Sequence, residues 1–585
     1  MPVRTAVGKG GRSRAEFDRF AEVRLCPSFF ARSRPVDVAT IGPILTNHST
    51  TRLGSRPSDV LAQRVRSHYV RAMQADIGFN PWFECQHRQR RVREMSIVTN
   101  LPRLSQKHSG AYFTPDDVTA ALVSWAVGKA SDRMLDPSCG DGRFLACHSN
   151  SVGIEQDSVS AHAAIAQAPS ALVHEGDFFA WAEATNERFE CAAGNPPFIR
   201  YQTFKGDIRR RALELCAVRG VAFNGLASSW APFLVATAGL LKPGGRMAFV
   251  VPAEIGHAPY AAPLLDYLVD SFSSVRIVAV RDKLFPTLSE DCWLLYAEGH
   301  GGRTDHIALT VTDRFTPAKT PPRATVRVDV GEWRSIWNRR LRPYLLPRAV
   351  RAMYQAAVTD PTSHRLGEFA SVGIGYVSGD NNFFHLRPSE AARWKIPSAF
   401  LHPTIRNGRA MPARQITKAT VDGWTKSDQQ MFLLRLKRGQ ELPTSITRYL
   451  DSSAGREARL GYKCRNRTPW YAVPDVHMPE FVMSYMSGRS VNLVRNQAGV
   501  TCTNSVHAVR VRDAALAAKL LPTWSTPFVT LSCELEGHAL GGGMLKLEPR
   551  EAARILFPAA TAPALPAGAV EDAITTMQRW RHYGG

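Results

Sequence analysis

The sequence predicts an α/β fold built on a mixed, mostly parallel sheet whose strands alternate with helices. Three observations predict it: short apolar runs that each end at an acidic residue, a glycine-rich turn directly after one of them, and a proline-stiffened corner after another. In open α/β sheets, ligands bind beside the carboxyl ends of the strands. We therefore expect the residues that follow the strands to form the functional site.

The first strand-like run ends at Asp136 and leads into Pro-Ser-Cys-Gly-Asp-Gly, residues 137–142. Gly140 and Gly142 allow a tight turn and a close approach of the backbone to a ligand. The apolar run that follows predicts a helix. The turn lacks the full GxGxxG pattern and the sequence has no Walker lysine, so a nicotinamide cofactor or ATP fits less well.

Two further acidic residues accompany the next predicted strands. The run 152–154 ends at Glu155, and Asp177 stands before an apolar run that begins at Phe178. An acid at the end of the second strand usually binds a ribose diol. Each acid taken alone fits a helix cap or a turn equally well. Three at successive strand ends predict contacts for an amine, a ribose and an adenine amino group.

The most informative stretch is Asn-Pro-Pro-Phe, residues 195–198, which follows an apolar run ending at Gly194. Two consecutive prolines do not fit a helix interior or a central strand, because each lacks a backbone donor. The bend would present Asn195 Oδ1 and the Pro196 carbonyl to the two hydrogens of an amino group, and the Phe198 ring to a flat substrate. A plain proline turn that closes the strand is the alternative.

Upstream, Gly-Ala-Tyr-Phe-Thr-Pro occupies residues 110–115. Thr114 is predicted to be a helix N-cap and Pro115 the first helical residue. Asp116 and Asp117 would then lie in the first turn, where the helix dipole favours negative charge. As a bare feature, this is more often an ordinary capped helix than a cofactor-binding segment.

The order of these motifs resembles that of the gamma-class N6-adenine DNA methyltransferases, the TaqI/Eco57I-like type II restriction-modification methylases. The resemblance covers about residues 105–557. It implies a Rossmann-like catalytic domain dependent on S-adenosylmethionine, a C-terminal α+β target-recognition domain that binds DNA, and a basic N-terminal extension. The expected division is 1–104 for the extension, 105–325 for the catalytic domain, 326–557 for target recognition, and 558–585 for a linker and tail.

The resemblance also assigns roles to residues. Phe285 would stack on the opposite face of the target base from Phe198, with a core position as the alternative. The expected catalytic residues are Asn195, Pro196, Pro197 and Phe198. The expected cofactor-binding residues are Tyr112, Thr114, Pro115, Asp136, Ser138, Gly140, Gly142, Glu155, Asp177 and Phe178.

The C-terminal half interleaves cations with aromatics over residues 461–471. Arg465 and Arg467 are predicted to alternate in one extended run that reaches bases or phosphates, since guanidinium groups pair with guanine edges. Lys463 is a further candidate for DNA contact. A solvated charged surface is the alternative. Trp470 and its neighbour Tyr471 are equally compatible with core packing.

Composition bounds the remaining possibilities. The chain has 585 residues, a net charge of +22, and half of that excess within residues 1–110, densest at 88–93. Such a charge indicates a polyanion as partner, although a solvated surface is the alternative for the N-terminal part. The ten cysteines form neither a C-x-x-C pair nor a Cys/His cluster, which argues for a reducing compartment and against structural zinc. We expect no metal cofactor.

Neither a membrane-spanning run nor the apolar core of a signal peptide is found in the sequence, so a cytoplasmic, nucleoid-associated protein is expected. Residues 558–570 predict a flexible linker, and 574–583 a short amphipathic end.

These features together predict methyl transfer from S-adenosylmethionine to N6 of an adenine flipped out of double-stranded DNA at a specific site. A cognate restriction endonuclease would act as a separate protein. Methylation of an RNA adenine or of a protein glutamine amide is the alternative reaction. A catalytically idle DNA-binding module is an alternative of a different class.

Overall fold

The computed structural model describes residues 113–585, except 287, 289, 541, 560–564 and 585. Three features of the sequence therefore lie outside the described residues: Tyr112, the charge-dense stretch 88–93, and the basic extension 1–104.

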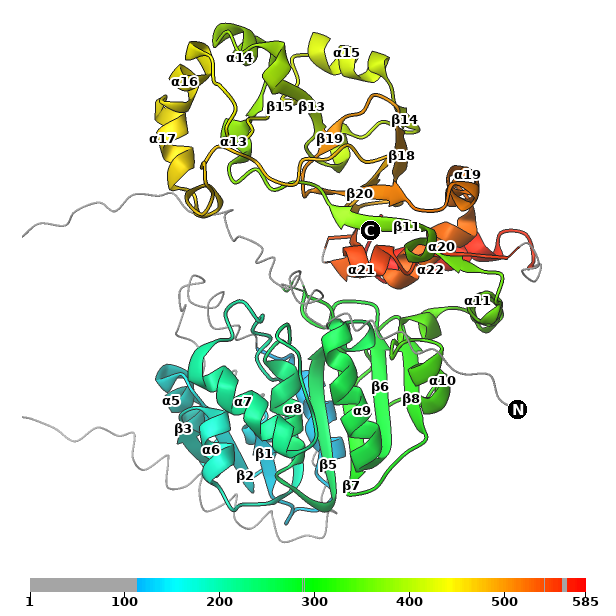
Figure 1. The fold of residues 1–585 in the computed structure, drawn as a ribbon. Coiled ribbons are helices and arrows are strands. Elements are labelled where there is room, and N and C mark those ends of the chain that lie inside the picture. Colours follow the sequence, from blue (N-terminus) through cyan, green and yellow to red (C-terminus); the bar gives the residue numbers. More distant parts are fainter. Residues whose placement is uncertain (1–112, 287, 289, 541, 560–564, 585) are drawn as a thin grey trace, which may run out of the picture. The chain divides into compact units, whose positions relative to one another are not determined.

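One large sheet of nine strands organises the first part of the described residues (Figure 1). Its strand order is β3-β2-β1-β4-β5-β7-β6-β8-β9. Strands β3 to β5 in this order run parallel, whereas β7 is antiparallel to both β5 and β6. The predicted mixed, mostly parallel sheet is confirmed. The strands are β1 (Met134–Asp136), β2 (Ser151–Glu155), β3 (Leu172–Glu175), β4 (Phe189–Gly194), β5 (Leu241–Pro252), β6 (Phe272–Val280), β7 (Cys292–His300), β8 (His306–Thr312) and β9 (Val326–Asp329).

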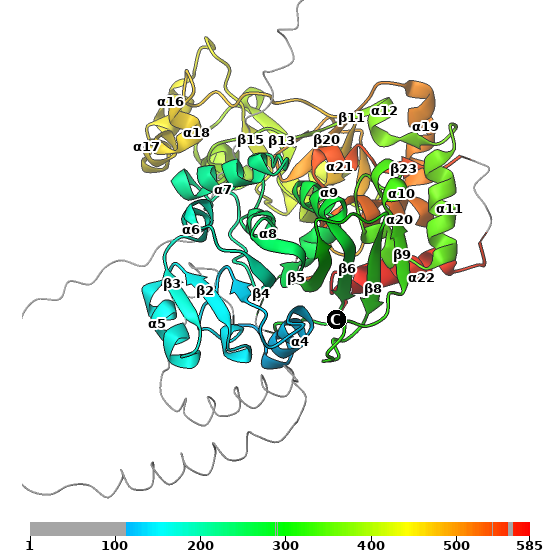
Figure 2. The same cartoon turned by 90° about the horizontal axis from the view of Figure 1, so that it is seen from below.

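Helices cover both faces of this sheet, because its central strands are apolar on both sides. Helices α8 and α9 lie over one face, where Trp230 and Leu268 are fully buried, and α4 lies over the other, where Leu122 is fully buried (Figure 2). The helices of this part are α4 (Asp116–Ala126), α5 (Ser158–Gln167), α6 (Phe178–Ala184), α7 (Gly206–Val218), α8 (Trp230–Ala238), α9 (Ala262–Ser271) and α10 (Val330–Ser335), with 3-10 turns at Leu145–Cys147, Ala253–Gly256 and Pro259–Ala261.

The C-terminal part combines small sheets with short helices, as predicted for an α+β region. Two of the sheets have the strand orders β11-β20-β16-β18-β14 and β12-β15-β13-β19, and smaller ones join β17-β22-β21 and β10-β23. The strands are β10 (His364–Arg365), β11 (Ala370–Ile374), β12 (His385–Leu386), β13 (Leu401–Ile405), β14 (Gln415–Ile416), β15 (Phe432–Leu434), β16 (Phe481–Ser484), β17 (Met486–Ser487), β18 (Leu493–Asn496), β19 (Thr501–Cys502), β20 (Val506–Val511), β21 (His538–Leu540), β22 (Met544–Lys546) and β23 (Leu556–Phe557).

The helices of the C-terminal part are α11 (Arg348–Thr359), α12 (Leu366–Phe369), α13 (Asn381–Phe384), α14 (Pro388–Arg393), α15 (Lys418–Lys426), α16 (Thr444–Leu450), α17 (Ser453–Leu460), α18 (Tyr462–Arg465), α19 (Ala514–Trp524), α20 (Pro527–Glu536), α21 (Pro549–Ala552) and α22 (Ala569–Arg579), with 3-10 turns at Arg342–Leu345, Ser398–Phe400 and Gly408–Ala410. None of the helices in the described ranges is long and apolar enough to cross a membrane.

The sequence predicted a helix after the glycine turn, but residues 143–150, all of them described, contain no α-helix. A single 3-10 turn, Leu145–Cys147, takes its place, and the chain enters β2 at Ser151. Only three residues separate the turn from the strand, so an α-helix has no room to form. A local apolar run could not reveal this constraint, because the position of β2 in the sheet imposes it.

The chain after residue 565 is more ordered than predicted. Helix α22 begins at Ala569, within the stretch predicted as a linker, and buries Ala573 and Met577. The amphipathic pattern predicted for 574–583 therefore corresponds to a docked helix and the turn that follows it.

Candidate active site

The acidic residues and the Asn-Pro-Pro-Phe corner meet at one edge of the large sheet. Asp136 ends β1, Glu155 ends β2, Asp177 follows β3, and Asn195 follows β4. These four strands are neighbours and run parallel, so their carboxyl ends lie at the same edge. The strand order reverses between β1 and β4, which is where open α/β sheets bind ligands.

Asp136 is fully buried and lacks a compensating charge among the described residues. Its Oδ1 accepts the Ser138 amide at 3.1 Å, whereas Oδ2 has no hydrogen-bond partner there. Burial raises the pKa of this carboxyl group to about 8, with a smaller contribution from the charges of Glu155 and Asp141, whereas the hydrogen bond from the Ser138 amide opposes the rise. A ligand ammonium group would supply the missing positive charge.

Glu155 shapes the glycine loop. Its Oε2 accepts the Gly140 amide at 2.9 Å, and Oε1 accepts the Asp157 amide at 2.8 Å. A Cβ at Gly140 would meet no atom within 4 Å, whereas one at Gly142 would lie 2.7 Å from Ala164 Cα. Gly142 is therefore needed for packing against α5, and Gly140 borders open space, where a ligand can approach the backbone.

Asp177 caps helix α6, one of the roles left open by the sequence. Its Oδ1 accepts the Ala180 amide at 2.9 Å, and Arg211 lies 3.6 Å from the same oxygen. The neighbouring Phe178 is buried and stacks on Phe233, with ring centroids 5.1 Å apart. Asp177 thus lies at the strand edge, and the Phe178 ring lies in the core behind it.

Asn195 is held by two residues from other segments. Its Nδ2 donates to Thr114 Oγ1 at 3.2 Å, and Ser138 Oγ donates to its main-chain carbonyl at 3.4 Å. A Cβ at the preceding Gly194 would lie 2.6 Å from Asp136 Oδ1, so only glycine fits there. The NH2 of the amide faces Thr114, and the amide oxygen consequently points in a different direction.

The two proline carbonyls differ. The Pro197 carbonyl accepts the Ser229 hydroxyl, whereas no donor among the described residues binds the Pro196 carbonyl. Ser229 Oγ also accepts the Ile199 amide at 3.0 Å, and the Ser229 amide donates to the Ile199 carbonyl. Sequence reasoning missed Ser229. No local pattern marks it, because its contacts join residues about thirty positions apart.

Phe198 and Phe285 belong to one apolar cluster. Phe198 is half-buried, and Phe285 is 5% exposed, packed near Leu284 and Leu288. Phe285 therefore has the core position that was the alternative, in the cluster against which Phe198 packs. Its stacking on a target base stays a prediction.

The Thr-Pro segment differs from the prediction by one residue. The N-cap of α4 is Pro115 and the helix begins at Asp116, so the prediction of Thr114 as N-cap was wrong. Thr114 is 2% exposed, and its hydroxyl accepts from Asn195 instead. A contact with a distant side chain thus replaces the local capping bond.

Arg143, which sequence reasoning also missed, fastens this segment to the glycine loop. Its guanidinium group donates to the Thr114 carbonyl, forms an ion pair with Asp141 at 2.7 Å, and lies 3.6 Å from Asp116. It also stands 4.9 Å from the centroid of the Phe113 ring. In the sequence, Arg143 directly follows Gly142, the last glycine of the turn, and this position could have indicated its role at the loop.

The predicted extended run of cations is wrong. Tyr462–Arg465 forms the short helix α18, and Arg467 follows it in a turn. Both terminal nitrogens of Arg467 donate at 2.6 Å, to the Ser378 and Val377 carbonyls, and burial lowers its pKa. Arg467 therefore has a structural role, since each of its terminal nitrogens donates to a main-chain carbonyl.

Lys463 and Arg465 remain candidates for nucleic-acid contact. Their charged groups lie 5.9 and 5.7 Å from the ring centroid of Tyr462, which is 52% exposed. Trp470 packs on Phe383 in the neighbouring apolar cluster, as the core alternative predicted.

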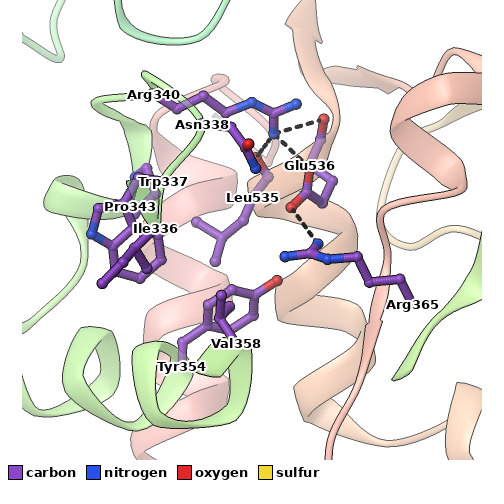
Figure 3. A pocket seen from close by; sticks show the side chains of 10 residues that line it. All are labelled: Ile336, Trp337, Asn338, Arg340, Pro343, Tyr354, Val358, Arg365, Leu535 and Glu536. Atoms are coloured by element: carbon purple, nitrogen blue, oxygen red, sulfur yellow. Dashed lines mark hydrogen bonds and ion pairs between the residues drawn. The ribbon is translucent and has the colours of Figure 1, made fainter. Parts of the chain in front are cut away.

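A second group of buried charges surrounds a small pocket in the C-terminal part. Figure 3 shows Glu536 between the guanidinium groups of Arg340 and Arg365. Arg340 Nη1 lies 2.8 Å and Arg554 Nε 3.0 Å from Glu536 Oε2. The protein therefore supplies the counterions of Glu536 from its own arginines. In the described ranges no group of three or more His, Cys, Asp or Glu side chains could hold a metal ion.

Comparisons with known proteins show what the chain is similar to. The family model "N-6 DNA Methylase" matches residues 96–167, and "Type II methyltransferase M.Eco57I, C-terminal domain" matches residues 338–580. The type II methyltransferase M.AccI of Acinetobacter calcoaceticus is 20% identical over 76% of this chain and 84% of its own length. M.XamI of Xanthomonas campestris pv. amaranthicola is 22% identical over 77% and 85%.

Among solved structures, the DrdV-DNA complex is similar with a TM-score of 0.40 and 13% identity, over 90% of this chain and 62% of that one. A likeness of this degree adds nothing to the fold assignment. The two family matches, and the two relatives that extend over about three quarters of the chain, show that it is similar to type II DNA methyltransferases, with an N-6 DNA methylase segment in its first part and an M.Eco57I-like C-terminal domain.

Proposed function

We propose that this chain transfers the methyl group of S-adenosylmethionine to N6 of an adenine flipped out of double-stranded DNA, with Asn195 and Pro196 binding the amino group. The observation that carries this assignment is the arrangement at the β4 corner. The Asn195 amide is oriented by Thr114 at 3.2 Å, and it stands beside a buried, uncompensated carboxylate at the end of β1. This combination offers acceptors for an amino group next to a site for a cationic ligand.

The residues at the strand ends fit S-adenosylmethionine. Asp136 has a buried oxygen without a partner among the described residues, which suits the ammonium group of the methionine part. Gly140 borders open space beside Glu155, which suits a ribose with two hydroxyl donors. Asp177, at the next strand end, is our candidate for the adenine amino group, in addition to its capping of α6. When bound, this cofactor supplies an electrophilic methyl group on a sulfonium.

The protein's own contribution is binding and orientation. Asn195 Oδ1 and the Pro196 carbonyl accept the two N6 hydrogens, which draws the nitrogen lone pair out of conjugation with the purine ring. Phe198 stacks on one face of the base, and Phe285 is the residue available for the other. The cost of unstacking the base is a few kcal/mol, offset by these contacts. Positioning and fixed dipoles supply most of the rate, without a covalent intermediate.

The C-terminal part is proposed to recognise the DNA site. Lys463 and Arg465 flank the exposed Tyr462 ring, so they present cations and an aromatic face together. Phosphate contacts from such cations position the duplex and carry no sequence information themselves. A cognate restriction endonuclease would cut the same site as a separate protein, and the enzyme would act in the cytoplasm, where its DNA is.

Substitution of Asn195 tests the assignment. Asn195→Ala removes the amide acceptor, and we expect at least about a hundredfold loss of methyl transfer, the usual scale for one preorganised polar group. Cofactor affinity should change little, because the acidic residues that bind it remain. Transfer is measured with tritiated S-adenosylmethionine on unmethylated phage DNA, with RNA and protein substrates alongside, and affinity by calorimetry.

Asn224→Ala is a matched control, since Asn224 is an exposed asparagine whose side chain binds the nearby Leu226 amide. It should keep full activity. Undiminished methylation of DNA by Asn195→Ala would rule out the proposed role. Transfer to RNA or protein but not to DNA would replace the substrate class.

A further inference from the structure

The loop between β6 and β7, residues 281–291, is held on one side by the Asn-Pro-Pro-Phe corner. Glu290 Oε1 lies 3.0 Å from Nη2 of Arg200, which stands two residues after Phe198. The same loop carries Phe285. The segments that carry Phe198 and Phe285 are therefore joined by this ion pair, and both rings belong to the same apolar cluster.

On its other side the loop contacts residues near position 580. His582 Nε2 lies 2.9 Å from Asp291 Oδ1, and the two side chains are 27% and 20% exposed. The Asp291 carbonyl accepts the Ala253 amide at 2.7 Å, so the main chain here is fixed to the end of β5. Burial raises the pKa of Asp291, while His582 and Lys283 oppose that rise.

The residues around His582 are rigidly held. Arg581 is fully buried, and its guanidinium group binds both Glu534 oxygens, at 3.0 and 2.7 Å, and the Gly488 carbonyl at 2.6 Å. The Trp580 ring stands edge-on to Trp293 of β7, with centroids 6.1 Å apart. His582 thus follows two residues that are held by the core, and its ring contacts the loop at Asp291.

We propose that His582 is a positioning residue for methyl transfer, which holds Asp291 so that the 281–291 loop keeps Phe285 against the Asn-Pro-Pro-Phe corner. The inference rests on the proposed function, because it assumes that this corner receives the target base. His582 lies beyond both regions matched by the family models. The charged groups that face the contact are Lys283 and Glu290 of the loop, and Asp291 itself.

The experiment compares His582→Ala, His582→Gln, Asp291→Ala and the double alanine variant in the full chain, with tritiated S-adenosylmethionine and unmethylated phage DNA. His582→Ala should lower kcat about tenfold, because small misplacements of a positioning group are costly. The KM for the cofactor and the melting temperature should stay near those of the unchanged protein. His582→Gln is expected to keep most of the rate, since the amide of the new side chain can donate to Asp291 without a charge. The double variant should lose no more than either single one.

His364→Ala is the matched control, because His364 and Glu368 form an exposed histidine–carboxylate pair with 3.2 Å between the charged atoms. It should keep the full kcat. An unchanged kcat in His582→Ala, an equal loss in His582→Gln, or additive losses in the double variant would overturn the inference. Asn195→Ala is assayed in parallel: if it is inactive while His582→Ala is fully active, only the role of His582 fails. If Asn195→Ala is active, the proposed function itself fails.

Discussion

Asp136 and Glu536 are both buried acids, and their surroundings are opposite. Asp136 is at the strand edge, fully buried, and no basic group in the described residues lies within ion-pair distance of it. Glu536 is 9% exposed and surrounded by Arg340, Arg365 and Arg554 (Figure 3). Burial raises the pKa of both carboxyl groups, but the arginines oppose that rise only at Glu536.

We infer from this difference that Glu536 is a structural acid and that Asp136 is available to bind a ligand. A buried charge is tolerated when the protein pairs it, and removing one partner of such a group is costly. A buried acid without a partner destabilises the ligand-free fold. Its presence is explained when a cationic ligand supplies the missing charge. Burial alone, which is common to both sites, does not mark a functional residue.

The largest effect on stability is expected from a substitution of Glu536, the acid that is paired with arginines. Glu536→Ala leaves three arginine side chains without their shared counterion, so the free energy of unfolding should fall by about 3–5 kcal/mol. Urea unfolding followed by circular dichroism measures this loss. Cofactor affinity of the folded fraction should not change. If Glu536→Ala weakened cofactor binding while leaving stability intact, the division between the two acids would be wrong.

At Asp136, which has no counterion among the described residues, we expect the opposite effects on stability and on cofactor binding. Asp136→Asn removes a charge that burial disfavours, so the cofactor-free protein should melt at a higher temperature at pH 8. Cofactor binding should weaken about a hundredfold, the scale of a buried charged hydrogen bond. Calorimetric titration and thermal melting of the same samples give both quantities. A lower melting temperature without loss of affinity would show that Asp136 is structural.

The same acid predicts a pH dependence. With a pKa of about 8 in the cofactor-free fold, Asp136 is mostly protonated at pH 7 and ionised at pH 9. If only the ionised form binds the ammonium group, the Kd should fall about tenfold between pH 6 and pH 7, a range in which the ligand's own ammonium group stays protonated. Because the folded pKa lies above the unfolded one, the stability of the cofactor-free fold should decrease as pH rises from about 4 to 8. Asp136→Asn should abolish both trends.

The strands and acids of the site could be predicted because each signal is local. Apolar runs ending at Asp136, Glu155 and Gly194 marked three neighbouring strand ends, and parallel pairing brings such ends to one edge. The glycine turn and the double proline are also local, since each depends on the backbone freedom of its own residues. Sequence alone therefore located the edge of the sheet where these residues meet.

What the sequence did not reveal depends on contacts between distant residues. Thr114 was predicted to cap its own helix, yet its hydroxyl binds Asn195, eighty-one positions away. Ser229 holds the Pro197 carbonyl from thirty-two positions away, and Arg467 binds Ser378 from eighty-nine. Alternation of charges near Arg467 suggested a strand, but the chain forms helix α18 there. No pattern within one segment encodes such partners.

The smallest effect is expected from a substitution of Arg143. It tests whether Asp136 is without a counterion in the cofactor-free protein. Arg143 forms ion pairs with Asp141 and Asp116, and among the described residues it forms none with Asp136 itself. Arg143→Ala should therefore weaken cofactor binding only about fivefold, within the range of partly buried ion pairs, by releasing the Thr114 carbonyl. Arg210→Ala is the control, because Arg210 forms exposed ion pairs with its helix neighbours Asp207 and Glu214. If Arg143→Ala instead lost as much affinity as Asp136→Asn, the cation at position 143, and not a ligand, would be the counterion of the buried acid.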